Sequence, residues 1–184
     1  MTTYIALLRG INVGGHNKIK MAALREALQT LALHNIQTYI QSGNILFESS
    51  ESEAVLQQQI HATIQEVFAI TSTVIIRTAE EFQAIVKECP FSAEEIAAAG
   101  ATAIGECLHV AFLPAPPTAV SAETFLAYAN DKERCVIAGR NIYLLFYESV
   151  RNAKLSQKLH QLELPATVRN WKTITKLAAM ADGI

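Results

Sequence analysis

The chain has 184 residues, of which 51% are hydrophobic and 17% are charged, and its formal net charge is −2. Intrinsic disorder requires low hydrophobicity and high net charge, so this composition excludes it. A near-neutral total also gives no overall attraction to nucleic acid or to an acidic membrane. Composition therefore indicates a soluble globular protein with enough chain for one ordinary domain or two small ones.

The cysteines and the N-terminal residues bear on the cellular compartment. Cys89, Cys107 and Cys135 are too few and too scattered for a disulfide framework or a zinc site. We interpret them as small buried residues in a reducing compartment. The start of the chain lacks the pattern of a signal peptide, and no apolar run approaches the ~18 residues that span a bilayer. The sequence predicts a cytoplasmic protein with no metal, no cofactor and no membrane partner.

Apolar periodicity in the first half predicts the order strand, helix, strand, strand, helix, strand. Continuous apolar or β-branched runs are typical of buried strands, and apolar residues at helical spacing are typical of amphipathic helices. The turn at residues 41–44 makes a hairpin of the two middle strands. In chain order, the expected elements are a strand at 4–8, a helix at 21–33, strands at 36–40 and 45–47, a helix at 55–68 and a strand at 73–77.

The same order recurs after residue 106, followed by one additional helix. The sequence therefore predicts an α+β fold with two ferredoxin-like βαββαβ halves, a pseudo-duplication. Residues 1–78 form the first half, 79–106 a helical connector with a capping box at Ser92 and Glu95, and 107–184 the second half, all in one compact unit. The later elements are a strand at 108–113, a helix at 121–129, strands at 134–137 and 142–146, a helix at 155–162, a strand at 166–169 and a helix at 171–181.

Several of these strands do not alternate apolar with polar residues. The runs at 4–8, 74–76 and 142–146 are apolar throughout, which predicts that both faces of each sheet are covered and that the two antiparallel sheets pack on each other or join. An RNA-binding module of this topology needs an open, aromatic sheet face. The pattern therefore weakens an RNA-binding interpretation.

The first candidate site is the glycine loop, residues 9–18, between the first strand and the first helix. Its glycines can turn backbone N–H groups outward, and the helix N-terminus and two basic side chains add positive charge. These features suit a phosphate or a carboxylate, although a purely structural loop would use the same Asn and Gly residues. The candidate ligand-binding residues are Arg9, Gly10, Asn12, Gly14, Gly15 and Lys18, and His16 is the best general-base candidate.

Two further segments carry polar motifs. In the C-terminal segment, residues 169–177, Asn170 is a good N-cap and the Lys172–Lys176 spacing suits a counter-anion, so Arg169, Asn170, Lys172 and Lys176 are candidates, with a solvated helix face as the alternative. In the hairpin tip, residues 39–44, amide groups could read a ligand, but turn chemistry alone also explains them. The hairpin candidates are Gln41, Ser42 and Asn44.

Residues from all three motifs carry a family resemblance. They are the segments 8–15, 39–44 and 169–171 together with Lys18, Met21, Thr173, Lys176 and Leu177. The sequence resembles the bacterial family called domain of unknown function 1697 from residue 4 to about 178, including Arg77 and the segment 89–91. This resemblance implies an α+β protein with a ferredoxin-like duplication, and it implies no activity because the family is named for lacking one.

Our leading hypothesis is a small anionic ligand in a cleft formed by the glycine loop and the C-terminal segment, in a protein whose enzymatic activity is an open question. The alternatives are a nucleic-acid-binding protein, with these segments as a phosphate track, and a non-catalytic interaction module. The charge distribution agrees with a local anion site. Residues 1–47 carry a formal charge of +3, residues 48–106 carry −8 and residues 107–184 carry +3.

Overall fold

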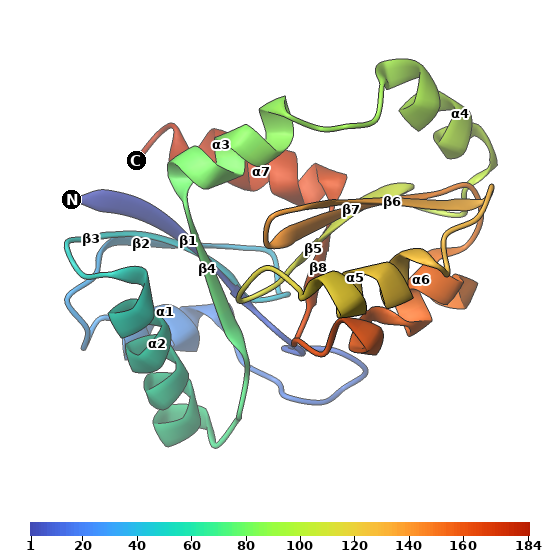
Figure 1. Cartoon of the computed structure of the whole chain (residues 1–184). Coiled ribbons are helices and arrows are strands. Elements are labelled where there is room, and N and C mark those ends of the chain that lie inside the picture. Colours follow the sequence, from blue (N-terminus) through green and yellow to red (C-terminus); the bar gives the residue numbers. More distant parts are fainter. The chain divides into compact units, whose positions relative to one another are not determined.

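The computed structural model describes residues 1–184 and contains eight main strands. Hydrogen bonds place them in two antiparallel four-stranded sheets with the orders β2-β3-β1-β4 and β6-β7-β5-β8 (Figure 1). The predicted α+β class with a repeated βαββαβ order is confirmed. The strands are β1 (Thr2–Leu8), β2 (His34–Tyr39), β3 (Asn44–Ser49), β4 (Val74–Thr78), β5 (Leu108–Phe112), β6 (Glu133–Ala138), β7 (Asn141–Phe146) and β8 (Thr167–Asn170).

The helices lie in the connections between strands where the sequence pattern predicts them. The capping box of Ser92 and Glu95 is present at the start of the second connector helix, and the additional C-terminal helix is confirmed. The α-helices are α1 (Met21–Leu28), α2 (Glu53–Phe68), α3 (Ala79–Lys87), α4 (Ala93–Thr102), α5 (Ala119–Leu126), α6 (Lys154–Gln157) and α7 (Trp171–Ala181), and short 3₁₀ turns lie at Val150–Asn152 and Leu159–Leu162.

The chain forms two compact units. The first contains Met1–Val86 and Lys176–Ile184, and the second contains Lys87–Thr175. The predicted connector, residues 79–106, is therefore shared between them, with α3 in the first unit and α4 in the second. The end of α7 belongs to the first unit, where the Gln83 side-chain amide donates a hydrogen bond to the Asp182 carboxylate.

The core of the first unit lies between its sheet and the two helices α1 and α2, which run side by side against one face (Figure 1). Tyr4, Ala6 and Leu8 of β1 point into this core. Ile5 and Leu7, on the opposite face of the same strand, are also fully buried. Side chains on both faces of this sheet are thus covered, as the apolar strand pattern predicts, whereas packing of the two sheets on each other stays a prediction.

Two helices are shorter than the periodicity predicts. The helix expected at 21–33 ends at Leu28, where the Thr30 hydroxyl bonds the Ala27 carbonyl and competes with the helical hydrogen bond. The helix expected at 155–162 is only one turn of α-helix followed by a 3₁₀ turn, because the backbone leaves helical geometry at Lys158. Leu155 and Leu162 still reach the core of the second unit, so the periodicity identified buried side chains correctly but not the backbone between them.

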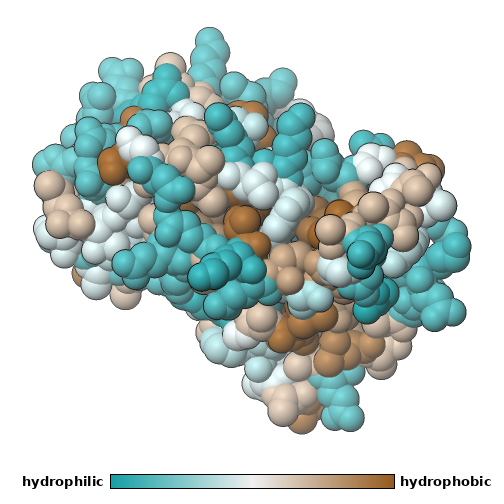
Figure 2. Space-filling view, turned by 90° about the horizontal axis from the view of Figure 1, so that it is seen from above, coloured by the Kyte–Doolittle hydropathy of each residue, from teal (hydrophilic) through white to brown (hydrophobic).

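No helix combines the length and the hydrophobicity needed to cross a membrane. Figure 2 shows hydrophobic residues that reach one face of the molecule among hydrophilic ones. The three cysteines are free and only half-buried, which corrects the prediction that they are buried, and partial burial raises the pKa of the Cys135 thiol to about 11.

The hairpin tip contacts β1 so closely that an added methyl group should destabilise the protein. Gly43 has a φ of +80°, and a Cβ added there would lie 2.8 Å from the Leu8 Cβ. We expect Gly43→Ala to lower the free energy of unfolding by about 2–4 kcal/mol, because it combines backbone strain with overpacking. Urea denaturation measures this change.

Gly139→Ala is the matched control, since Gly139 also has a positive φ, +59°, but nothing lies within 4 Å of an added Cβ. Its cost is expected to be about 1 kcal/mol, from backbone strain alone. Equal losses in the two variants would contradict the close approach of the hairpin tip to Leu8.

Candidate functional site

The glycine loop leaves β1 and folds back through several left-handed residues. Gly10, Gly14 and Gly15 have φ values of +70°, +58° and +79°, while Asn12 and Asn17 have +55° and +50°. Glycine adopts this region freely and asparagine tolerates it better than most residues. The sequence of the loop is therefore matched to a backbone that other residues would strain.

Asn12 connects the glycine loop to the hairpin tip. Its Nδ2 donates to the Ile19 carbonyl at 2.9 Å and to the Gln41 carbonyl at 2.7 Å, and its Oδ1 accepts from the Ile19 N–H at 2.9 Å. One amide group thereby satisfies three backbone groups, two on Ile19 and one on Gln41, which lies 29 residues after Asn12. This bridge brings two of the three predicted motifs to one place.

An open pocket of about 560 Å³ lies where these two segments meet. It contains four of the predicted ligand-binding residues and two others, a buried isoleucine and a second lysine. The lining residues are Asn12, Gly15, Lys18, Ile19, Lys20 and Gln41. The volume falls within the range of about 300–1,000 Å³ that is typical of small-molecule sites.

The pocket is electropositive. Ile19 is only 3% exposed, and Lys18 and Lys20 on either side of it are both exposed. Side chains alternate along an extended backbone, so the two lysines project together, away from the core. No carboxylate lines the pocket or pairs with either lysine. Helix α1 begins directly after Lys20 without a capping side chain or an acidic residue in its first turn, so its N-terminal dipole adds to the positive potential.

Lys20 is the residue that sequence reasoning missed. The signal for it was the pattern of Lys18 and Lys20 around an apolar Ile19, which places both ammonium groups on one side of an extended segment.

Other predicted residues of the glycine loop do not line this pocket. Arg9 is exposed, and only its backbone is bonded, to Thr73 and Ser72. Gly10 accepts a hydrogen bond from the Asn17 side chain, and Gly14 lies in a tight turn closed by a bond from His16 N–H to the Val13 carbonyl. The His16 side chain is exposed and makes no hydrogen bond that would position it as a base.

The hairpin tip separates into one residue that faces the pocket and two that close the turn. The Asn44 side chain is fully buried, and its Nδ2 donates to the Tyr39 carbonyl at 3.0 Å and to the Ser42 hydroxyl at 2.9 Å. These bonds close the turn. They agree with the alternative interpretation from the sequence, in which turn formation alone explains these residues. Gln41, in contrast, has an exposed side chain without an intramolecular partner.

The C-terminal segment lies across the boundary of the two units. Arg169 is buried in β8, donates to the Val168 carbonyl at 3.0 Å, and has its pKa lowered by burial to about 10. Asn170 is the expected N-cap, with its Oδ1 accepting from the Thr173 N–H at 2.9 Å. Lys172 and Lys176 are exposed on α7. Because these residues lie mainly in the second unit, a cleft shared with the glycine loop stays a prediction.

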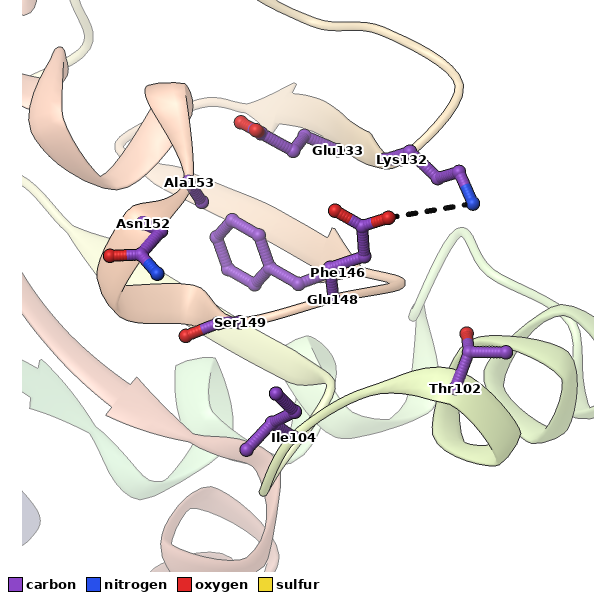
Figure 3. Close-up of a pocket in the computed structure, with 9 residues that line it drawn as sticks. All are labelled: Thr102, Ile104, Lys132, Glu133, Phe146, Glu148, Ser149, Asn152 and Ala153. Carbon is purple, nitrogen blue, oxygen red and sulfur yellow. Dashed lines mark ion pairs between the residues drawn. The ribbon is translucent and has the colours of Figure 1, made fainter.

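A second pocket, of about 310 Å³, lies in the second unit between β6, β7 and the segment after them (Figure 3). Its charged groups already have partners. Lys132 and Glu148 form an ion pair at 3.6 Å, and the Glu133 carboxylate accepts the Leu155 N–H at 2.9 Å, where it caps α6. Paired charges have little need of a ligand, so this pocket is a weaker candidate than the lysine-lined pocket.

A third pocket, of about 620 Å³, contains His109 and Asn170 from neighbouring strands. The Nδ1 atom of His109 is buried without a hydrogen-bond partner, and the ring lies edge-on to Phe146 at 5.7 Å. Burial lowers the pKa of this histidine to about 4. With this pKa the imidazole is neutral at neutral pH. No cluster of three His, Cys, Asp or Glu residues that could hold a metal ion is present.

Comparisons with known proteins identify the family and the fold. Residues 1–143 match the family described as "Protein of unknown function (DUF1697)". The structure of the conserved bacterial protein SP0830 from Streptococcus pneumoniae is similar, with a TM-score of 0.70, 26% sequence identity and 98% of each chain covered. No curated protein matches the chain. The family resemblance is therefore confirmed, and neither match names a ligand.

The Asn12 bridge predicts a measurable loss of stability. We expect Asn12→Ala to lower the free energy of unfolding by about 2–3 kcal/mol, because it unpairs three backbone groups and leaves alanine at positive φ. Asn17→Ala, which removes one exposed hydrogen bond at a similar φ, should cost less. Urea denaturation of both variants makes the comparison, and equal losses would refute the bridging role of Asn12.

Burial of His109 predicts a pH-dependent stability. Its folded pKa of about 4 lies below the value of 6.5 for an unperturbed histidine, so between these values the unfolded chain binds a proton that the folded chain does not. The free energy of unfolding should therefore fall by about 3 kcal/mol as the pH drops through this window. His109→Gln should flatten this part of the profile, and an unchanged profile in that variant would rule out the assignment.

Proposed function

We propose that this chain, which belongs to the family described as "Protein of unknown function (DUF1697)", binds a small anionic ligand in the pocket between the glycine loop and the hairpin tip. The observation that supports the proposal best is the pair of unpartnered lysines, Lys18 and Lys20, in a pocket without a carboxylate. Neither charge has an ion-pair partner within the protein, so both are available to a counter-charge. A phosphate or carboxylate group supplies that counter-charge.

The C-terminal segment remains part of the proposal as a second source of positive charge. Arg169, Asn170, Lys172 and Lys176 carry no acidic neighbour within their own segment. We keep them as candidate ligand-binding residues, separate from Lys18 and Lys20.

Three broader assignments also belong to the proposal. We propose that each half is ferredoxin-like, on the basis of its strand order and βαββαβ sequence of elements. We propose a bacterial protein, since the similar solved structure is of a bacterial protein. We propose a cytoplasmic location because all three cysteines are free.

Anion binding is tested by calorimetric titration and thermal shift with inorganic phosphate, nucleotides and dicarboxylates. In the double variant Lys18→Gln/Lys20→Gln, affinity should fall by about 100-fold or more, since hydrogen bonds to charged groups contribute about 1.5–3 kcal/mol each. Arg9→Ala should change affinity less, because Arg9 does not line the pocket.

Lys154→Gln is the matched control, since Lys154 is exposed, has no ion-pair partner and lines none of the pockets described. Absence of any ligand-induced stabilisation that depends on Lys18 and Lys20 would refute the proposal. Salt-dependent binding of oligonucleotides that exceeds binding of mononucleotides would instead support the nucleic-acid alternative.

A further inference from the structure

The volume of the lysine-lined pocket bears on what kind of anion it takes. At about 560 Å³, it is larger than a bare phosphate or carboxylate ion requires, and it matches the size of sites that hold small organic molecules. The two lysines occupy only one part of the lining, on either side of Ile19. The pocket therefore has room for an organic part in addition to a charged group.

The charge of the pocket bears on the charge of the ligand. Lys18 and Lys20 are two cations on the same side of one extended segment, and no acidic residue lines the pocket. A phosphate monoester carries a charge of about −1.5 to −2 at neutral pH and three acceptor oxygens. It matches two ammonium groups better than a carboxylate or a phosphodiester, each of which carries a single negative charge.

Gln41 is a polar residue in the lining of the pocket that is available to the organic part of a ligand. Its backbone carbonyl is held by the Asn12 Nδ2 at 2.7 Å, so the residue has a fixed position at the edge of the pocket. Its side-chain amide is exposed and has no partner within the protein. A primary amide both donates and accepts hydrogen bonds, which suits hydroxyl groups or the polar edge of a base.

From these three observations we infer that the pocket binds a phosphate monoester whose organic part carries hydrogen-bonding groups, such as a sugar phosphate or a nucleoside monophosphate. This inference rests on the proposed anion-binding function and specifies its ligand class. Lys18 and Lys20 hold the phosphate, and the Gln41 amide selects for the organic part.

The experiment uses calorimetric titration of the full chain with four probes, namely methyl phosphate, ribose 5-phosphate, AMP and cyclic AMP. Ribose 5-phosphate or AMP should bind at least about tenfold more tightly than methyl phosphate, which lacks a polar organic part. Cyclic AMP, a phosphodiester, should bind at least about tenfold more weakly than AMP. Tight binding of ribose 5-phosphate identifies a sugar phosphate, and tight binding of AMP alone identifies a nucleotide.

Gln41→Ala separates recognition of the organic part from recognition of the phosphate. The variant should lose the advantage of ribose 5-phosphate or AMP over methyl phosphate while its affinity for methyl phosphate stays unchanged. Gln37→Ala, which removes another exposed glutamine side chain of the same unit, is the matched control and should behave as the wild type. The Gln41 side chain has no partner in the fold, so the thermal unfolding midpoint should not move.

The two proposals fail in different ways. Binding of inorganic phosphate that depends on Lys18 and Lys20, without preference for ribose 5-phosphate or AMP over methyl phosphate, would overturn this inference and leave the anion site intact. Equal affinity for AMP and cyclic AMP, or an unaltered preference in Gln41→Ala, would also overturn it. Absence of any lysine-dependent anion binding would overturn the proposed function itself.

Discussion

The hydrogen bonds of the Asn12 side chain hold the glycine loop against the hairpin tip, and the candidate site depends on the alignment of these two segments. Lys18 ends the loop, Lys20 lies directly before α1 and Gln41 belongs to the hairpin tip, and the bridge joins these segments in addition to the bond from the Leu8 N–H to the Gly43 carbonyl. The bridge also fixes the Gln41 backbone before a ligand arrives. Ordering the groups in advance lowers the entropic cost of binding, which is the physical advantage of a bonded loop over a mobile one.

The distribution of charge separates this pocket from the others in the molecule. In the pocket of the second unit, Lys132 has Glu148 as a partner and Glu133 caps a helix. The first 47 residues contain a single acidic residue, Glu26, whereas ten lie between residues 48 and 106. The nearly neutral total therefore conceals a segment whose lysines lack nearby carboxylates in the sequence. A charged side chain without an ion-pair partner can bind a ligand without first breaking an ion pair, whereas a paired side chain cannot.

Local sequence signals predicted most of the fold, because strands with buried faces and helices with apolar stripes leave a periodic pattern. They failed at the end of α1 and after Lys158, where a hydroxyl or a local change of backbone geometry ends a helix although the apolar residues continue. The site was predicted as separate motifs. Its assembly depends on a hydrogen bond between residues 29 apart, from Asn12 to Gln41, and no local pattern encodes such a contact. Lys20 was missed for a different reason, since its alternation with Lys18 around Ile19 was a local signal, and the pocket shows that both lysines line it.

The duplicated fold supplies an internal comparison for the glycine loop. Arg77 pairs with Ile5 and Arg169 pairs with Val110, so the two sheets carry a buried arginine at matching positions of their last strands. The connection from first strand to first helix differs completely between the halves. In the second half, residues 113–118 contain three prolines, no glycine and no charge, and Thr118 caps the following helix through its side chain. Proline has no N–H to offer an anion. The fold therefore forms with a neutral, proline-rich connection at this point. The basic, glycine-rich loop of the first half, which leads into an uncapped helix, is not needed to build the fold.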